Sequence, residues 1–446
     1  MPADLDELLT GLGRAADTIP LAGAEQARRR GRQRTHRQAA FSAALAVCLV
    51  AVGVGAVVSR PRHDADRTIS PTPSSRVLTE VGSPVDTGGP ASSVGQAVGD
   101  GKLFSAWTTP GGEMRLNAAD LHTGAVLWTF TEQAAGAVTD VRALPDAVMV
   151  RVERSVAFYD PATGSPIRRF RVGDADELIS YGKVMVRRWA SNGEVVASDV
   201  RTGQPVWSDT ANPAARLLAD GDRLIQVTEA GKILVRDAAK GTLLRTITPA
   251  GPPGTQYVVA GGRLFTETIP CCDTAAYRVV SSDLTTGKSE VILSGGPAKF
   301  AGMDACGTNR ICVLDAGPAG AGRVTAVDVV SHRQLWRKAA PDNASAISAS
   351  GENVLVGGPG AETVLLLAAD GSSAFRTPDT SVGWLGTDAL LMMPATAAGS
   401  VMTFRIPDRQ LTRLGDIPRR IGPCVNTADR LACPTDDSLR LWSLTG

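Results

Sequence analysis

From residue 76 onward, the hydrophobic positions fall into short runs that polar turn residues interrupt every few positions. One stretch shows this clearly, because apolar-rich runs at 215–219, 223–228, 232–237 and 242–247 are separated by turns that each contain glycine. Runs of five or six residues bounded by such turn signals predict four short strands in an antiparallel meander. The pattern therefore indicates an all-β fold for this part of the chain.

This four-strand unit recurs along the chain. Its turn lies near residues 120, 160, 199, 237, 283, 328, 370, 405 and 442. A four-stranded unit that repeats about every 40 residues is the signature of a β-propeller. The turns number nine, but eight blades are commoner for this kind of repeat, and the units near 370 and 405 are irregular. We therefore expect a β-propeller of eight, or else nine, four-stranded blades.

The two ends of the repeat region predict how the ring closes. The last unit contains three apolar runs, at 422–426, 430–433 and 438–442, and lacks a fourth. A spare apolar run at 76–81 precedes the first unit. Pairing of that run with the last unit would close the ring and remove exposed sheet edges, which favour aggregation.

A turn motif followed by a tryptophan marks some units most clearly. Copies of Asp-x-x-Thr-Gly-x-x-x-Trp occupy 120–128, 199–207 and 328–336, the last with Ser331 and His332 in place of the Thr-Gly pair. Looser copies near 160, 237 and 283 keep the turn and lack the tryptophan. Glycine adopts positive φ without steric cost, and Asp or Thr side chains bond the turn backbone.

These copies resemble the repeats of propellers of the pyrroloquinoline-quinone (PQQ) type, within the wider superfamily of WD40/YVTN-like repeats, over roughly 76–446. The resemblance implies that Trp128, Trp207 and Trp336 dock on the glycine turn of the neighbouring blade. An indole buries up to ~250 Å² and its N–H can bond a turn carbonyl, which suits that role. Proteins of this type include quinone-dependent alcohol dehydrogenases, an outer-membrane assembly lipoprotein and single-pass propellers of unknown role.

The first 75 residues differ in character from the repeats. Residues 39–58 carry no charge, and 20 residues can cross ~30 Å of hydrocarbon as a helix. Six arginines lie shortly before this run, so the positive-inside rule places 1–38 in the cytoplasm and the propeller, 76–446, outside the cell membrane. Residues 59–75 are rich in Pro, Ser and Thr and are expected to form a linker. A cleaved signal peptide is the alternative for the apolar run, and a lipid or partner contact is the alternative for the arginines.

Charge and histidine content exclude several classes of function. A net charge of +1 argues against a nucleic-acid-binding surface. The repeat region holds two histidines, His122 and His332, and both fall in hairpin turns. A His-based metal cluster, a Ser-His-Asp triad or a Cys-His pair is therefore not expected there, and no catalytic residue is predicted.

Four of the seven cysteines form two pairs. Cys306 and Cys312 flank one turn between the first two strands of a unit, and Cys424 and Cys433 flank another. Residues equidistant from a hairpin turn face each other with Cβ atoms ~4.5–5.5 Å apart, which is close to disulfide geometry. Two cross-hairpin disulfides are predicted, in keeping with an oxidising compartment. The alternative is two pairs of reduced, buried cysteines.

Two further features bear on cofactors. The adjacent Cys271 and Cys272 are expected to clip a turn, but the PQQ resemblance implies an alternative in which a vicinal disulfide contacts a quinone accompanied by calcium. Metal binding or redox use of the pair is a third option. The acidic cluster of Asp174, Asp176 and Glu177 lacks the spacing of a calcium loop and is expected to lie in a solvated loop. No cofactor and no metal are predicted.

These features predict a membrane-anchored β-propeller outside the cytoplasm that acts as a binding or scaffold module for a protein, peptide or glycan. One alternative is a quinone- or metal-dependent oxidoreductase on the same scaffold, suggested by Cys271 and Cys272. Another is an envelope sensor whose cytoplasmic residues 1–38 contact a regulator.

Overall fold

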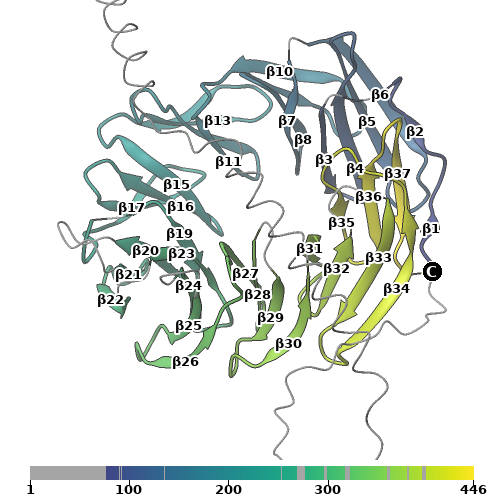
Figure 1. Cartoon of the computed structure of the whole chain (residues 1–446). Helices are drawn as coiled ribbons and strands as arrows, with labels where there is room; N and C mark the ends of the chain where they lie inside the picture. The colour runs from purple at the N-terminus through teal and green to yellow at the C-terminus, as the bar shows by residue number, and fades with distance from the viewer. Residues whose placement is uncertain are drawn as a thin grey trace, which may run out of the picture. The chain divides into compact units, whose positions relative to one another are not determined.

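The computed structural model consists of short antiparallel strands joined by tight turns (Figure 1). It describes residues 77–445 apart from gaps at 90, 92, 135, 253, 269–276, 296–298, 317–321, 359–361, 379–380 and 394–397. The described residues belong to one unit of the chain, Arg67–Gly446, and form nine sheets without a helix. No helix able to cross a membrane is found in this part of the chain, and the predicted span 39–58 lies outside it.

Each sheet is one blade, and eight of the nine are four consecutive strands in a simple meander. The first three blades consist of β3 (Ser93–Gly99), β4 (Lys102–Thr108), β5 (Glu113–Asp120) and β6 (Val126–Gln133); β7 (Val138–Leu144), β8 (Ala147–Val152), β9 (Ser155–Tyr159) and β10 (Pro166–Arg171); and β11 (Glu177–Tyr181), β12 (Val184–Arg188), β13 (Val195–Asp199) and β14 (Pro205–Asp209).

The middle blades continue the same arrangement. They consist of β15 (Ala214–Asp220), β16 (Arg223–Thr228), β17 (Ile233–Asp237) and β18 (Leu243–Ile247); β19 (Tyr257–Ala260), β20 (Arg263–Thr268), β21 (Arg278–Asp283) and β22 (Ser289–Ser294); and β23 (Lys299–Ala305), β24 (Arg310–Ala316), β25 (Arg323–Asp328) and β26 (Gln334–Ala339).

The last three blades include the closing sheet. They consist of β27 (Ala346–Ser350), β28 (Asn353–Gly357), β29 (Thr363–Leu367) and β30 (Ser373–Thr377); β31 (Ser381–Trp384), β32 (Ala389–Met393), β33 (Gly399–Arg405) and β34 (Gln410–Ile417); and β35 (Val425–Asn426), β36 (Arg430–Pro434) and β37 (Ser438–Ser443) with β1 (Thr79–Glu80) and β2 (Val85–Asp86).

Apolar residues on both faces of the inner strands hold the blades together. In β8, five of six residues are buried, because one face packs on the first blade and the other on the third. The described residues contain nine clusters of buried apolar side chains, with one cluster at each interface between neighbouring blades. The ninth cluster joins Leu103 of the first blade to Leu441 of the last. The core is therefore a closed series of interfaces between sheets.

The chain around residue 80 closes this series. β1 and β2 both pair with β37, at Thr79↔Ser443 and Val85↔Leu439, and together they supply the outer strand that the last blade lacks. The N–H of Val81 also donates to the carbonyl oxygen of Leu441 at 2.8 Å. The predicted closure by the N-terminal strand is confirmed.

The preference for eight blades is wrong, and the count of nine turns is right. The two units that looked irregular both form complete four-stranded blades, β27–β30 and β31–β34. Their turns lack the usual aspartate, because Leu367 and Arg405 stand in its place, but the backbone closes them all the same. For example, the N–H of Gly371 donates to the carbonyl oxygen of Leu367 at 2.8 Å. The backbone conformation, more than the side chain, defines the unit.

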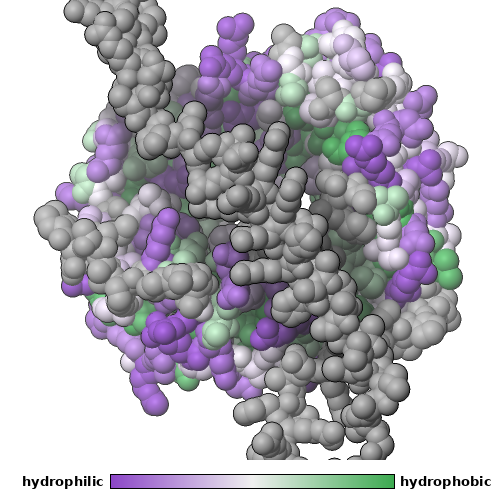
Figure 2. Space-filling view, in the orientation of Figure 1, coloured by the Kyte–Doolittle hydropathy of each residue, from purple (hydrophilic) through white to green (hydrophobic). Residues whose placement is uncertain are grey.

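The outer strands carry the solvated surface. β6 and β18 are mostly exposed, whereas β4 and β16 are buried along most of their length. Figure 2 shows hydrophilic side chains over much of the visible face, with smaller hydrophobic patches between them.

Replacing Val81 by proline tests the closure, because proline has no N–H to donate to Leu441. The substitution Val81→Ala, which keeps the N–H, is the matched control for the lost side chain. We expect Val81→Pro to lower the free energy of unfolding by about 1–3 kcal/mol beyond Val81→Ala, the cost of an unsatisfied buried carbonyl, measured by denaturant titration. Equal stability of the two variants would show that this hydrogen bond does not close the ring.

Candidate functional site

The Asp-x-x-Thr-Gly sequence forms a tight turn that its own side chains hold in place. Asp120 Oδ1 accepts the N–H groups of His122 and Thr123 at 3.0 and 2.7 Å and the Thr123 hydroxyl at 2.9 Å. Gly124 adopts φ = 73°, and its N–H donates to the Asp120 carbonyl oxygen. The same carboxylate contacts recur at Asp199, so the motif is a repeated structural turn.

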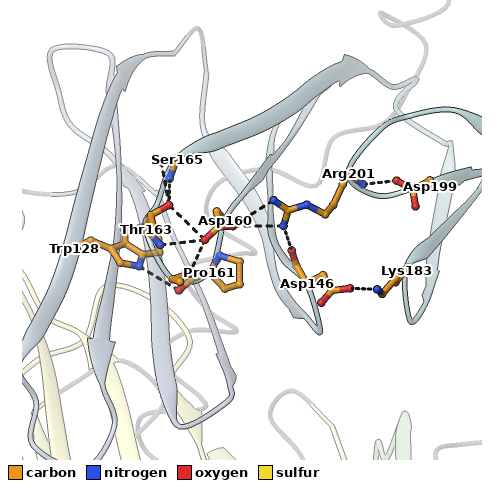
Figure 3. A network of polar contacts seen from close by, with 10 residues as sticks. Trp128, Asp146, Asp160, Pro161, Thr163, Ser165, Lys183, Asp199 and Arg201 are labelled. Atoms are coloured by element: carbon orange, nitrogen blue, oxygen red, sulfur yellow. Dashed lines mark hydrogen bonds and ion pairs between the residues drawn. The ribbon is translucent and has the colours of Figure 1, made fainter.

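Each motif tryptophan lies on the glycine turn of the following blade. Trp128 in β6 donates its indole N–H to the carbonyl oxygen of Pro161 at 3.2 Å, and Figure 3 shows the ring beside the Asp160 turn. A Cβ built on Gly164 would lie 2.5 Å from the Trp128 ring, so only glycine permits this approach. We call such a contact, from a fourth strand to the next blade's turn, an interblade latch.

Two more tryptophans form the same latch. Trp207 donates to the carbonyl oxygen of Ala238 at 3.0 Å and covers Gly241. Trp336 donates to Ala368 at 2.7 Å and covers Gly371. The blade-docking position that the repeat resemblance implied for Trp128, Trp207 and Trp336 is thus the position they occupy.

Arginine takes the tryptophan position in two other blades, those with the looser copies of the motif near residues 160 and 237. Arg245 donates to the carbonyl oxygen of Thr286 at 3.2 Å, beside the Gly287 turn. The Arg168 guanidinium lies against Gly203, with its centre 5.0 and 5.1 Å from the rings of Phe158 and Phe170. Burial lowers the pKa of Arg168.

The turns of neighbouring blades are also joined to each other. Arg201, in the turn of the third blade, reaches Asp160 Oδ2 in the second at 3.4 Å, and it donates to the carbonyl oxygen of Asp146 at 3.3 Å (Figure 3). At the sixth blade, His332 replaces the glycine at φ = 58°, and its Nε2 lies 2.9 Å from Glu290 Oε1 of the fifth. In both cases, therefore, a residue of one turn contacts an acidic side chain of the neighbouring blade and joins the two blades.

Polar side chains also join the first strands of successive blades. Glu177 of β11 accepts the N–H of Leu217 in β15 at 2.8 Å and pairs with Arg216 at 3.0 Å. Asp304 of β23 accepts the N–H of Ala349 in β27 at 2.7 Å, and burial raises the pKa of Asp304. These acids satisfy backbone donors at the inner sheet edges.

The expectation of a solvated acidic loop near residue 175 is wrong for Glu177, which begins β11 and bonds the next blade, and for Asp176. The Asp176 side chain is buried and binds Arg187 Nε at 2.9 Å and the N–H groups of Gly173 and Ala190, both at 2.8 Å. Burial opposes its ionisation, but these donors outweigh burial and lower the pKa of Asp176. Asp174 is exposed, as expected for a surface loop.

Both predicted disulfides are present. Cys424 lies opposite Cys433 beside the paired Val425 and Ala432, with Cα atoms 4.3 Å apart, as the hairpin argument requires. Cys306 and Cys312 are bonded with Cα atoms 5.8 Å apart, but the strand register places Asp304 opposite Cys312. The second pair is therefore diagonal across its hairpin, a geometry that counting from the turn did not anticipate.

A cavity of about 1020 Å³ lies between the first and second blades. Val150 and Val152 of β8 line its wall, and the residues of β9 paired with them are the small Ala157 and Ser155. Because these two side chains are small, the apolar interface leaves the space unfilled here. The volume is at the upper end of the ~300–1,000 Å³ range of ligand pockets.

Charged groups surround this cavity. Glu132 Oε1 accepts the Tyr159 hydroxyl at 2.8 Å and pairs with Arg169 from β10. Burial, and then Glu132, raise the pKa of Tyr159. Arg171 lies two residues beyond Arg169 on the same strand and also lines the cavity. The sequence pattern did not predict this site, although Arg168, Arg169 and Arg171, three arginines within four residues of an outer strand, were the available signal.

Several predicted features lie outside the described residues, among them Cys271, Cys272, the basic segment 1–38 and the apolar run 39–58. Among the residues that the structure does describe, no three His, Cys, Asp or Glu side chains are grouped to hold a metal ion. The cofactor alternative built on the double cysteine therefore stays a prediction.

Sequence comparison supports the repeat type for part of the chain. A family model of PQQ-type repeats, described as outer membrane protein assembly factor BamB, matches residues 191–290, which include β13 to β21 and the start of β22. The predicted resemblance is thus confirmed over three adjoining blades. No curated protein matches the sequence significantly.

Solved structures are similar to this chain at low sequence identity. A eukaryotic initiation factor is 11% identical over 76% of this chain and 93% of its own, with a TM-score of 0.56. BamB from Moraxella catarrhalis is 15% identical over 63% and 97%, with a TM-score of 0.40, and the C-terminal WD40 domain of Sif2 is 10% identical over 83% and 99%, with a TM-score of 0.45. The first of these supports the fold and nothing further.

The latch can be tested with two glycines that share a positive φ. A Cβ on Gly241 (φ = 71°) would lie 2.5 Å from the Trp207 ring, whereas Gly221 (φ = 60°) has no heavy atom within 4 Å. We expect Gly221→Ala to cost about 1–2 kcal/mol from φ alone, and Gly241→Ala to cost about 1–3 kcal/mol more from overpacking. Denaturant titration measures both, and equal costs would contradict the latch.

The turn aspartates predict loss of stability in acid. Backbone N–H donors lower the pKa of five of them, Asp120, Asp160, Asp199, Asp283 and Asp328. A lowered folded pKa stabilises the protein above the unfolded value of about 3.9, and this stability is lost as the pH falls through the folded pKa. We expect the thermal midpoint to fall between pH 5 and pH 3.

An asparagine variant shows whether these turns cause the effect. Asp199→Asn should be less stable than the natural protein at pH 5 and should lose less on acidification, since residue 199 no longer titrates. Asp436→Asn, at an exposed position in the connection between β36 and β37 and outside the Asp-x-x-Thr-Gly turns, is the control. An unchanged acid dependence in Asp199→Asn would exclude this turn as a source of the acid dependence.

Proposed function

We propose that the protein is a membrane-anchored propeller, held outside the cytoplasm by residues 39–58, that acts as a binding or scaffold module for a protein partner. The observation that carries this proposal is that polar and aromatic residues of the repeat contact the protein's own turns and blades. Asp120, Trp128 and Glu177 bond turns or neighbouring blades and Arg168 packs on one, so their role is to fix a rigid ring. A rigid ring with exposed loops and outer strands suits binding of macromolecules.

The disulfides support the proposed location. Cys306–Cys312 and Cys424–Cys433 are both bonded, and disulfides persist in oxidising environments outside the cytoplasm. The uncharged run 39–58 and the arginines before it supply the anchor and the orientation in this proposal.

The outer strands offer a contact surface for the partner. β6 exposes the adjacent Val126 and Leu127, and β18 exposes the adjacent Leu243 and Leu244, each about half accessible. These side chains lie immediately before the latch positions 128 and 245. Exposed aliphatic pairs on outer strands are suited to burial against another protein.

Capture of the full chain from intact, cross-linked cells tests the proposal. We expect a protein partner to be recovered with the natural chain, and Leu244→Glu to reduce the recovery at least several-fold, because it places a charge in an apolar contact. Thr246→Glu, on the same exposed face of β18, is the matched control and should have a smaller effect. Mass spectrometry of the captured chain should find both disulfides formed.

Two outcomes would contradict the proposal. Recovery of cysteines 306, 312, 424 and 433 as free thiols from rapidly alkylated cells would contradict the location. Failure to recover any protein partner, with turnover of a small molecule by the same chain, would favour the oxidoreductase alternative. Envelope sensing through residues 1–38 stays a further proposal, which deletion of that segment addresses.

A further inference from the structure

The cavity between the first two blades has the features of a small-molecule site. Its apolar wall is formed by Val150, Val152 and Ala157, which are at least nine-tenths buried. Ligand pockets typically combine such apolar walls with a few placed polar groups. Polar groups of two outer strands, β6 and β10, line it, together with polar residues of the β8–β9 hairpin and Asp174, so the site is formed by two blades.

One acceptor in the cavity is available to a ligand. Glu132 uses Oε1 for both the Tyr159 hydroxyl and Arg169, and no described residue bonds its Oε2. Tyr159 is fully buried and Arg169 is ion-paired, so the carboxylate is held in a fixed position. A ligand ammonium group could donate to the remaining oxygen.

One donor is available nearby. Arg171 lines the cavity and is exposed, and no described residue pairs with its guanidinium. It faces the same side of β10 as Arg169, since residues two apart on a strand share a face, and it lies about 7 Å further along the strand. Arginine binds carboxylates with two parallel hydrogen bonds.

We propose that this cavity binds a short apolar peptide with free ends, with its ammonium group at Glu132, its carboxylate at Arg171 and its side chains against the valine wall. A dipeptide spans about 7 Å between its ends, which matches the spacing along β10. This site is separate from the contact with a protein partner proposed above, and each can exist without the other.

Calorimetric titration of the full chain with the dipeptide leucyl-phenylalanine tests the site. We expect saturable binding of one dipeptide per chain, and binding at least about ten-fold weaker when the dipeptide is N-acetylated or C-amidated, since each loses one charge-assisted contact. Arg171→Gln should weaken binding of the free dipeptide to the same degree. Its effect on the C-amidated dipeptide should be small, because that ligand lacks the carboxylate.

Two further variants separate the site from folding. Ser155→Trp should fill the cavity and abolish binding, and its thermal midpoint reports whether the fold survives. Arg333→Gln, an exposed arginine on another blade, should leave binding unchanged. The proposal is overturned if the dipeptide does not bind at millimolar concentration, if the blocked dipeptides bind as well as the free one, or if Arg171→Gln binds normally.

Discussion

The structure depends on one steric condition. At each latched turn a glycine leaves the backbone uncovered, so that a side chain of the preceding blade can pack directly on it. At Gly164, Gly241 and Gly371 a Cβ would come within 2.5–2.7 Å of a tryptophan ring. Because these glycines also adopt positive φ, the same residue satisfies the turn and the contact. The distance between neighbouring blades is thereby fixed at the turn, and the apolar clusters fill the interface behind it.

The chemistry of the latch varies while its position is kept. Arg168 and Arg245 replace the tryptophan in two blades. Between the fifth and sixth blades, the carboxylate of Glu290 contacts the imidazole of His332. At the closing interface Gly82 approaches Gly124 backbone to backbone. The joint therefore tolerates substitution because the turn beneath it is defined by backbone hydrogen bonds, and so sequence motifs detect only some of its copies.

Whether a feature could be predicted from the sequence depends on how close together its residues lie along the chain. The tryptophan turns, the closing strand and the disulfides depend on residues a few positions apart or on a missing strand, and these were predictable. The blade count was misjudged because the turn at Leu367 lacks the usual aspartate and so looked irregular, although its backbone makes the same hydrogen bond. The cavity escaped prediction because it arises from small residues, Ala157 and Ser155, facing a different blade. Burial of Asp176 likewise depends on Arg187, eleven residues away in another strand.

Because Thr79 pairs with Ser443, the blades form a closed ring although the chain that forms them is linear. The two ends of the repeat region lie side by side in adjacent strands of one sheet, so the fold has no structural first blade. Joining those ends and cutting the chain in any turn between blades would leave every interface in place. The starting point of the chain is thus a matter of connectivity, and the positions of the cavity and the disulfides around the ring are independent of it.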